Sequence, residues 1–340
     1  MARDPGTLES GVLFGTDGQL FLADGEHSVL DFVSRQRSIS SESVSRFAAN
    51  IESRRRACDA QGIPYLHVLF PDKQSVLTAN FPISDPVCLG EAYLQRASAV
   101  SDMVLYPRSF LQRSGPDVFQ KTDTHLSDRG TVIVAKAVMD RLFDSRHEEA
   151  ITAFLADIRH SMEWVGDLGR RFDPPIGEVR KVYRGDHRTK WFHNGIVGGN
   201  NGLVDIRFNA HPVYDKRLLM FGDYFGRELC RFLSLLVREI VFLRTPFFHQ
   251  EMFEQIQPDV VISENVERYL SNCTPDADRP AFMMYPYLGQ AQYMPDREFS
   301  EAFSAVLSYP RRPYQALRGR VFPGAAPVMP DTRLVGIGAD

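Results

Sequence analysis

The sequence predicts an α/β protein in which a mostly parallel sheet forms the middle of three layers, with helices on both faces. Segments of strand length alternate with helical segments between residues 217 and 262, a pattern typical of βαβ units. The strand segments are apolar throughout instead of alternating, which indicates that both faces of the sheet are covered. The chain has 340 residues, 44% of them apolar, so it can bury a substantial core.

The N-terminal half shows turn residues and periodicity that predict a hairpin, helices and strands. A Gly-Thr-Asp-Gly turn between two apolar runs predicts a β-hairpin over residues 11–23. Helical spacing of apolar residues predicts a helix over 40–61, and Gly62 should end it. Strand formers that stop at a proline predict strands at 65–70 and 100–106, and a further helical stripe predicts a helix at 132–143.

The second half contains the clearest βαβ pattern. The expected order is a strand at 217–221, a tight turn at Gly222–Asp223, a helix at 227–238, and strands at 240–243 and 259–262 with a helix at 248–256 between them. Prolines are frequent after residue 270, and there only 298–307 looks helical. We therefore expect one α/β domain over 1–270 and an irregular C-terminal extension over 271–340.

Charge and composition exclude several classes of function. The net charge is −4, and a nucleic-acid partner would require a basic face, so none is expected. The four cysteines lack metal-ligand spacing, and no motif calls for a cofactor. The first ten residues lack a secretory pattern, and no run reaches about 18 consecutive apolar residues. A cytoplasmic protein without a membrane span is expected.

Two segments carry the strongest chemical signals. Asp123 and His125 are separated by one residue, so on an extended chain their side chains point to the same side. The carboxylate can then hold one ring nitrogen and leave the other free as a base. A metal is not expected, because two ligands without a third are weak evidence. The second segment is the turn at Gly222 and Asp223, where glycine permits close approach of a ligand and the following amides can stabilise an oxyanion.

These segments together resemble a known family over most of the chain, to about residue 270. The similarity includes residues 15–22, 62–65 with 71–73, 122–125, 166–169, the Gly222 turn and 258–262. The sequence resembles the SGNH-hydrolase-like domain of the alginate O-acetyltransferases, the AlgJ/AlgX-like group, in which the Asp-x-His segment precedes the serine turn. The resemblance implies a permuted SGNH-hydrolase-like fold and transfer or hydrolysis of acetyl esters on a carbohydrate. It also implies that Asp123 orients His125 and that His125 is the general base.

The sequence departs from the family pattern at the nucleophile. Tyr224 follows Gly222–Asp223 where the family has serine, and Leu126 follows His125 where the family usually has tryptophan. Loss of a triad serine costs roughly 10⁶ in turnover, or about 8 kcal/mol of barrier. A phenol is a poor substitute, because its oxygen lies farther from the backbone and its usual pKa is near 10. Ser234 is too distant along a helix to replace the serine, and Ser127 looks like a helix cap.

Three functions therefore stay open. The first is a carbohydrate acetyltransferase or acetylesterase that uses His125 without a serine, with Tyr224 donating a hydrogen bond to the carbonyl. The second is a catalytically silent relative that binds a glycan or regulates a partner, and the third is a structural role without a ligand. Arg108 could pair with a sugar-acid carboxylate, and Asn200 or Asn201 could line the cleft. The expected partner is a carbohydrate or acyl-sugar substrate, and the sequence is silent on oligomeric state.

Overall fold

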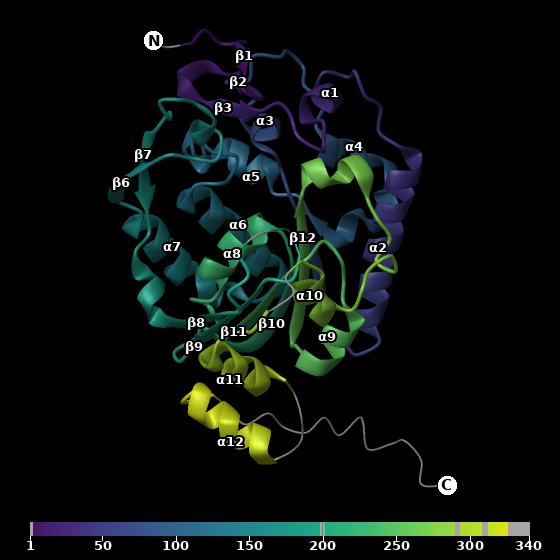
Figure 1. The fold of residues 1–340 in the computed structure, drawn as a ribbon, viewed down its shortest axis with the longest axis vertical. Coiled ribbons are helices and arrows are strands. Elements are labelled where there is room, and N and C mark those ends of the chain that lie inside the picture. Colours follow the sequence, from purple (N-terminus) through teal and green to yellow (C-terminus); the bar gives the residue numbers. More distant parts are fainter. Residues whose placement is uncertain (1–2, 198, 200, 290–292, 308–311, 326–340) are drawn as a thin grey trace.

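A seven-stranded sheet forms the centre of the protein (Figure 1). The computed structural model describes residues 3–197, 199, 201–289, 293–307 and 312–325. The strand order is β5-β4-β12-β10-β11-β9-β8, in which β5 to β11 are parallel and β9 and β8 each run antiparallel to their neighbour. The strands are β4 (Tyr65–Phe70), β5 (Val104–Leu105), β8 (Thr189–His193), β9 (Val204–Asn209), β10 (Tyr214–Gly222), β11 (Val237–Arg244) and β12 (Val260–Val266).

Helices cover both faces of this sheet, as the uninterrupted apolar strands predict. In β10, Leu218 and Met220 pack with one group of helices, whereas Leu219 and Phe221 belong to the core on the opposite face. The first face is covered by α6 (Asp128–Leu142), α7 (Glu148–Asp157) and α8 (Tyr224–Leu233). The second is covered by α2 (Ser41–Asp59), α9 (Gln250–Ile256) and α11 (Arg297–Val306).

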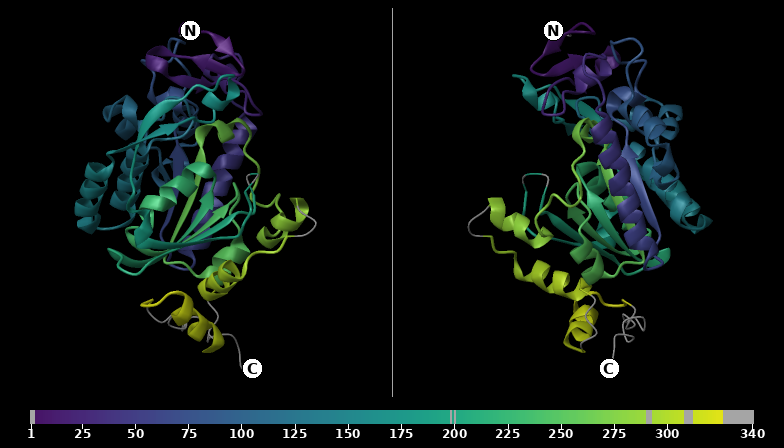
Figure 2. Two further views of the ribbon diagram at one scale, coloured as in Figure 1. Left: turned by 60° about the vertical axis from the view of Figure 1, so that its left-hand side comes forward. Right: turned by 90° about the vertical axis from the view of Figure 1, so that its right-hand side faces the viewer.

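Smaller elements lie at the two ends of the sheet (Figure 2). The N-terminal hairpin lies at the end where the parallel strands finish, and α11 and α12 lie at the other end. A second hairpin of β6 and β7 flanks the first one. The elements not yet named are β1 (Leu8–Glu9), β2 (Val12–Phe14), β3 (Leu20–Leu22), β6 (His160–Trp164), β7 (Glu178–Val182), α1 (Val29–Val33), α3 (Lys73–Val76), α4 (Leu89–Arg96), α5 (Arg108–Arg113), α10 (Tyr285–Gly289) and α12 (Arg312–Val321).

Most expected elements are confirmed, and three are corrected. The predicted strand at 100–106 is wrong over most of its length, because Ser98–Met103 form a 3-10 helix and only Val104–Leu105 pair with β4. The helix expected at 227–238 begins at Tyr224 and ends at Leu233, since Val237 and Arg238 already belong to β11. The segment 271–340, expected to be irregular outside 298–307, contains α10, α11 and α12 in its described part. The domain boundary at residue 270 stays a prediction.

No helix in the described ranges combines the length and apolar character that a membrane crossing requires.

Candidate functional site

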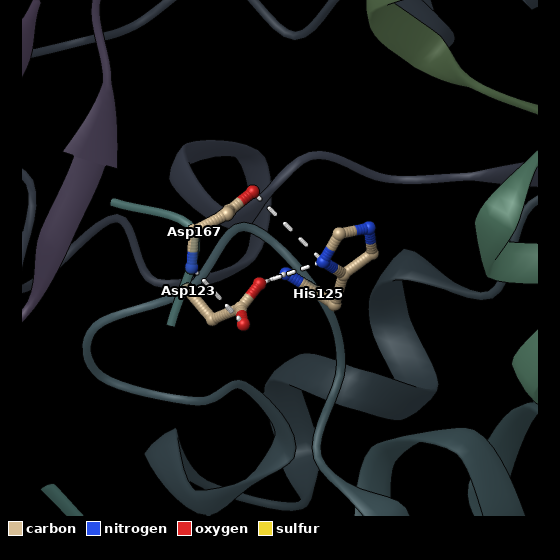
Figure 3. A group of neighbouring side chains, drawn as sticks. All are labelled: Asp123, His125 and Asp167. Atoms are coloured by element: carbon tan, nitrogen blue, oxygen red, sulfur yellow. Dashed lines mark hydrogen bonds and ion pairs between the residues drawn. The ribbon is translucent and has the colours of Figure 1, made fainter. Parts of the chain in front are cut away.

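Asp123 and His125 form a close hydrogen-bonded pair in the segment before α6 (Figure 3), which consists of turns and bends and not of the extended chain expected from the sequence. Nδ1 of His125 is 2.6 Å from Oδ1 of Asp123, and the same oxygen accepts the backbone N–H of His125 at 3.1 Å. A carboxylate can only accept, so Nδ1 carries the proton and Nε2 is the ring nitrogen left for a substrate. No described residue hydrogen-bonds Nε2, and the His125 side chain is 27% exposed.

The second oxygen of Asp123 is held by residues from the β6–β7 region. Oδ2 accepts the indole N–H of Trp164 at 3.2 Å and the backbone N–H of Asp167 at 3.4 Å. Burial alone would raise the pKa of Asp123, but the hydrogen bond and charge of His125 outweigh it and lower that pKa. Asp123 is therefore a firmly ionised, fixed partner of the imidazole. Sequence reasoning missed Trp164, because only the tertiary structure brings the β6 strand to this loop.

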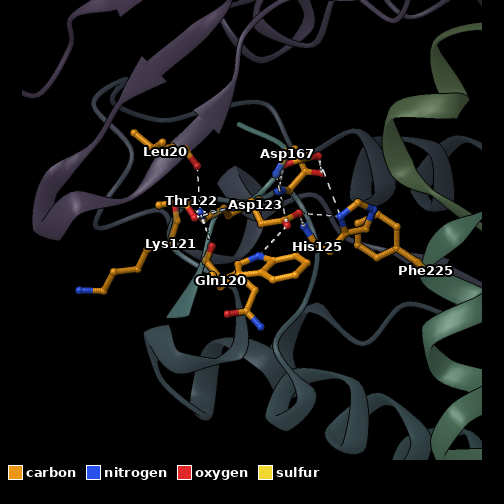
Figure 4. Close-up of polar contacts among 12 residues, drawn as sticks. Leu20, Gln120, Lys121, Thr122, Asp123, His125, Asp167 and Phe225 are labelled. Atoms are coloured by element: carbon orange, nitrogen blue, oxygen red, sulfur yellow. Dashed lines mark hydrogen bonds and ion pairs between the residues drawn. The ribbon is translucent and has the colours of Figure 1, made fainter. Parts of the chain in front are cut away.

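Lys73 fixes the backbone that carries the pair, namely the segment from Gln120 to Asp123 that is labelled in Figure 4. Its buried Nζ donates to the carbonyl oxygens of Leu20 at 2.9 Å, Gln120 at 2.6 Å, Lys121 at 2.8 Å and Asp123 at 3.2 Å. One amino group thus ties the N-terminal hairpin to the 120–123 segment, which places Lys73 as a positioning residue for Asp123.

Asp167 and Glu178 complete the frame of this loop. Asp167 accepts from the backbone N–H and the hydroxyl of Thr124, at 2.8 and 2.5 Å, and Glu178 accepts from the backbone N–H and the hydroxyl of Thr122, each at 2.7 Å. Both carboxylates therefore receive two hydrogen bonds from a single threonine. The segment that carries Asp123 is held on both sides.

The surrounding charges make His125 more basic than an ordinary imidazole. Burial lowers its pKa, but the hydrogen bond and charge of Asp123 and the charge of Asp167 raise it, and the net effect is a raised pKa. The positive charge of Arg268 partly opposes them. A more basic imidazole accepts a proton more readily, provided that it is neutral at the working pH.

The structure brings the Gly222 turn to the same edge as the Asp123–His125 pair. The rings of His125 and Tyr224 lie with their centroids 4.8 Å apart at 61°, and Phe225 lies 4.9 Å from the same imidazole. Burial and the charge of Glu228 raise the pKa of Tyr224, so its phenol stays protonated at neutral pH. Tyr224 therefore contacts the imidazole through its ring, as a neutral phenol and not as a phenolate, and its hydroxyl lies near Glu228.

Several of the backbone amides expected to stabilise an oxyanion, those of Asp223, Phe225 and Gly226, are already engaged. Oε1 of Glu264 accepts the backbone N–H of Asp223 and, at 3.0 Å, that of Gly226, while Asp223 caps α8 by accepting from Phe225 at 2.8 Å. A Cβ on Gly222 would lie 1.9 Å from Oε1 of Glu264. The close approach that the glycine permits is thus made by Glu264, and a role of Gly222 and Asp223 in binding a ligand stays a prediction.

The other predicted binding residues do not join this cluster. Arg108 is occupied by an ion pair with Glu91 and donates to the carbonyl of Ser75 at 2.6 Å, so its expected role with a sugar carboxylate is not supported. Asn201 is exposed in the β8–β9 connection, and no contact to the pair is recorded for it. Asn200 lies outside the described residues.

Neither alternative serine can replace the missing nucleophile. The hydroxyl of Ser127 caps α6 by accepting from Gly130 at 3.1 Å and donates to the carbonyl of Asp117. Ser234 is 1% exposed and donates to the carbonyl of Arg231. Both hydroxyls are used by the fold, as the sequence suggested for Ser127.

Arg268 supplies positive charge beside the pair and was not predicted. Its Nη2 lies 2.6 Å from Oδ1 of Asp72, and its guanidinium carbon lies 5.7 Å from the centre of the Phe225 ring. Its buried Nε has no hydrogen-bond partner in the described part of the chain. The signal that could have found it is its place just after the buried strand β12, at the carboxyl edge of the sheet.

Asp123, His125 and Asp167 also satisfy a geometric criterion for metal binding. One ligand atom of each lies within 4.8 Å of the others. However, Nδ1 of His125 is occupied by Asp123, and both carboxylates already accept several N–H or O–H groups. These contacts favour a hydrogen-bonded Asp–His pair over a metal centre.

Comparisons with known proteins point to one family. The model of the family described as "SGNH hydrolase-like domain, acetyltransferase AlgX" matches residues 12–183, half of the chain. A DHHW family protein from Eubacterium siraeum is 10% identical with a TM-score of 0.51, over 79% of this chain and 95% of its own. The O-acetyltransferase domain of Pseudomonas putida AlgJ is 17% identical with a TM-score of 0.46, over 83% and 100%. Pseudomonas aeruginosa AlgX is 13% identical with a TM-score of 0.45, over 80% and 65%. No curated protein matches the sequence.

Proposed function

The chain belongs to the SGNH hydrolase-like family of AlgX-type acetyltransferases, and on this premise we propose that it transfers or hydrolyses acetyl esters on a carbohydrate with His125 as the general base. The matched residues 12–183 include Asp123 and His125 but end before the turn that carries Tyr224. The proposal therefore relies on the part of the site that lies inside the family match.

The observation that carries the proposal is the Asp123–His125 pair. The 2.6 Å contact fixes the ring and leaves Nε2 directed away from Asp123 (Figure 3). Trp164 and Asp167 hold the carboxylate in place, and Lys73 holds its backbone. A purely structural histidine would not need this arrangement, in which the orienting group is itself oriented.

Without a serine, the reaction proceeds in a single displacement. Nε2 of His125 removes the proton from a water molecule or a sugar hydroxyl, whose oxygen attacks the acyl carbonyl carbon. The carbonyl π electrons move to its oxygen and return as the bond to the leaving oxygen breaks. The imidazolium then gives its proton to that leaving oxygen. Asp123 stabilises the imidazolium throughout.

Two groups can act on the carbonyl oxygen in place of the engaged turn amides. The neutral phenol of Tyr224 can donate a hydrogen bond to it, since its raised pKa keeps the proton in place. The charge of Arg268, which already acts on His125, can offset the negative charge that develops there.

The second candidate is a family member without catalytic activity that binds a glycan, and a specific observation favours it. Tyr224 stands where the family has its serine, and Glu264 occupies the amides of Asp223 and Gly226. An acyl-enzyme pathway would require a serine at position 224 and turn amides that are free to bind the carbonyl oxygen. In this second candidate the cleft would retain a binding role only.

Hydrolysis of p-nitrophenyl acetate tests the proposal. His125→Ala should lower the rate above background by about 10²–10⁴-fold, because a positioned general base contributes this much. His187→Ala is the matched control, since His187 is exposed and outside the site, and it should leave the rate unchanged. Tyr224→Phe should lower the rate by about 10²-fold through loss of one donor to the carbonyl oxygen.

Equal rates for wild type and His125→Ala would refute general-base catalysis for this ester. The second candidate would then be tested by calorimetric titration of an acetylated oligosaccharide into the two proteins. A Tyr224→Ser variant that gains His125-dependent hydrolysis would show that the remaining machinery is functional. No gain would indicate that Glu264 keeps the turn closed to a substrate.

A further inference from the structure

Trp191 presents an exposed aromatic ring on the face of the sheet that carries the candidate site. It lies in β8, the last strand in the sheet order (Figure 1), and it is 49% exposed. Trp191 pairs with Arg207 of β9, and successive residues of a strand face opposite sides of the sheet. Phe192 packs into the core beneath α11, so Trp191 lies on the face that α8 covers. The indole therefore extends the α8 side of the sheet into solvent.

Two arginines support the indole ring from the protein side. The guanidinium carbon of the buried Arg207 lies 5.0 Å from the centre of the ring, and that of Arg227 on α8 lies 5.6 Å from it. Arg227 is itself fixed, because its Nε and Nη2 donate to the buried carboxylate of Asp205 at 2.6 and 3.3 Å. The ring is therefore held against fixed groups on one side, and its exposed surface lies on the other. A surface that is ordered in advance loses little entropy when a ligand binds.

A continuous row of side chains links this ring to the general base. The rings of His125 and Tyr224 have their centroids 4.8 Å apart. Tyr224 and Arg227 are three positions apart in α8, so their Cβ atoms are neighbours at about 5–6 Å. Arg227 in turn contacts the ring of Trp191. A ligand whose reacting end is at His125, and which is longer than one small group, can therefore extend along α8 to Trp191.

His193 enlarges the flat surface and adds a hydrogen-bond donor to it. Its ring centroid lies 5.5 Å from that of Trp191, and the two ring planes are 28° apart. Nδ1 of His193 accepts the backbone N–H of Gly195 at 2.8 Å, so the ring proton is on Nε2. The surface thus combines an apolar indole face with the N–H groups of an imidazole and of the indole itself.

A flat apolar surface with N–H groups at its rim fits a pyranose ring. One face of such a ring carries C–H groups that pack on an aromatic ring, and its hydroxyl oxygens accept hydrogen bonds at the edge. We propose that Trp191 stacks against one sugar ring of the glycan while an acetyl group elsewhere on the same chain reaches His125. His193 donates from Nε2 to a hydroxyl of the stacked ring. This subsite, which rests on the proposed function, places the rest of the same substrate along α8.

Binding to a protein that lacks the general base tests the subsite apart from the reaction. The full-length His125→Ala protein is titrated by calorimetry with partially O-acetylated cellotetraose and tetragalacturonate, one neutral chain and one acidic chain. At least one of them should bind saturably, and adding Trp191→Ala should raise its Kd about tenfold through loss of the stacking face. Adding Trp191→Phe instead keeps an aromatic face, so the Kd should stay within about threefold.

Phe110 is the matched control for Trp191. It is 45% exposed, and the guanidinium carbon of Arg113 lies 5.2 Å from its ring, but it lies in α5, outside the row from His125 to Trp191. Phe110→Ala should leave the Kd unchanged. Hydroxyl-radical labelling of the unmutated protein, read by mass spectrometry, reports on both rings in one sample. The bound chain should lower the labelling of Trp191 and leave that of Phe110 constant.

Reaction rates separate the subsite from the proposed function. With the general base present, Trp191→Ala should lower kcat/KM about tenfold more for the tetrasaccharide than for p-nitrophenyl acetate, which is too short to reach from His125 to Trp191. The subsite is overturned if neither chain binds, if Trp191→Ala and Phe110→Ala bind equally well, if labelling of Trp191 stays constant, or if Trp191→Ala slows both esters equally. A protein that binds the chain at Trp191 but hydrolyses neither ester would refute the proposed function and retain the subsite.

Discussion

At the scale of single residues, the basicity of His125 follows from the charges around it. Burial and Arg268 lower its pKa, while Asp123 and Asp167 raise it by more. Asp123→Asn removes the hydrogen-bonded charge and leaves burial and Arg268 in place. We therefore expect the pKa of His125 to fall in this variant, which an NMR titration of the imidazole carbon-bound protons would measure. An unchanged pKa would mean that Asp123 does not orient His125 in solution.

The same variant should change how stability depends on pH. The pKa of His125 is raised in the folded state. Its contribution to the free energy of unfolding is therefore fully present below the unfolded pKa of about 6.5, and it is lost as pH rises through the folded pKa. The folded pKa of Asp123 is lowered, so its contribution is present above about 3.9 and is lost as pH falls through the folded pKa. The gap in unfolding free energy between wild type and Asp123→Asn should thus be larger at pH 5 than at pH 8.5. Urea unfolding at the two pH values measures this gap.

At the scale of elements, Glu264 on β12 fixes the junction between β10 and α8. Its carboxyl group fills the space that a Cβ would occupy on Gly222 and Gly226, at 1.9 and 2.2 Å, and it accepts the backbone N–H groups of Asp223 and Gly226. Gly222→Ala should lower the free energy of unfolding by about 1–3 kcal/mol, the usual cost of overpacking. Chemical denaturation measures this loss.

Gly319 in α12 is the matched control for Gly222. Nothing lies within 4 Å of a Cβ built there, and the residue is exposed within a helix. Gly319→Ala should therefore be neutral or stabilising by about 0.5–1 kcal/mol. If Gly222→Ala were as stable as Gly319→Ala, the carboxyl group of Glu264 would not lie against the turn.

Helices and strands were predictable where apolar residues that face the core recur at a regular spacing. The helix at 40–61 and the strand at 65–70 follow from periodicity and from glycine or proline stops. Strand β9 was missed because Asp205 and Arg207 interrupt its apolar residues, yet every residue of the strand is buried. Asp205 forms a 2.6 Å ion pair with Arg227 of α8, so a tertiary partner allows a charge within a buried strand.

The candidate site was predictable only where its contacts are local in sequence. Asp123 and His125 are two positions apart, so the sequence suggested their pairing, although the chain bends here and the backbone N–H of His125 also bonds Oδ1 of Asp123. The contacts of Trp164 and Asp167 with Asp123 span more than forty positions, as does that of Glu264 with Asp223. No spacing rule reports such contacts, because they depend on the order of strands in the sheet.

At the scale of the whole molecule, the last described helices complete one face of the sheet. Phe322, which directly follows α12, stacks on Phe208 of β9 with centroids 4.9 Å apart at 25°, and both are buried. Arg318 forms an ion pair with Glu239 on β11, and Arg217 on β10 donates to the carbonyl of Val306 at 3.1 Å. The C-terminal helices therefore share their core with the central strands.

This shared core predicts that the sheet and the C-terminal helices unfold together. Phe322→Ala removes a fully buried ring and should lower the free energy of unfolding by about 3–5 kcal/mol in a single transition. Met294→Ala is the control, because Met294 is 90% exposed and its loss should change stability by less than about 0.5 kcal/mol. Denaturant unfolding followed by tryptophan fluorescence reports on the sheet side, since Trp164 and Trp191 lie in β6 and β8. If Phe322→Ala left that transition unchanged, the C-terminal helices would form an independent unit that only rests against the sheet.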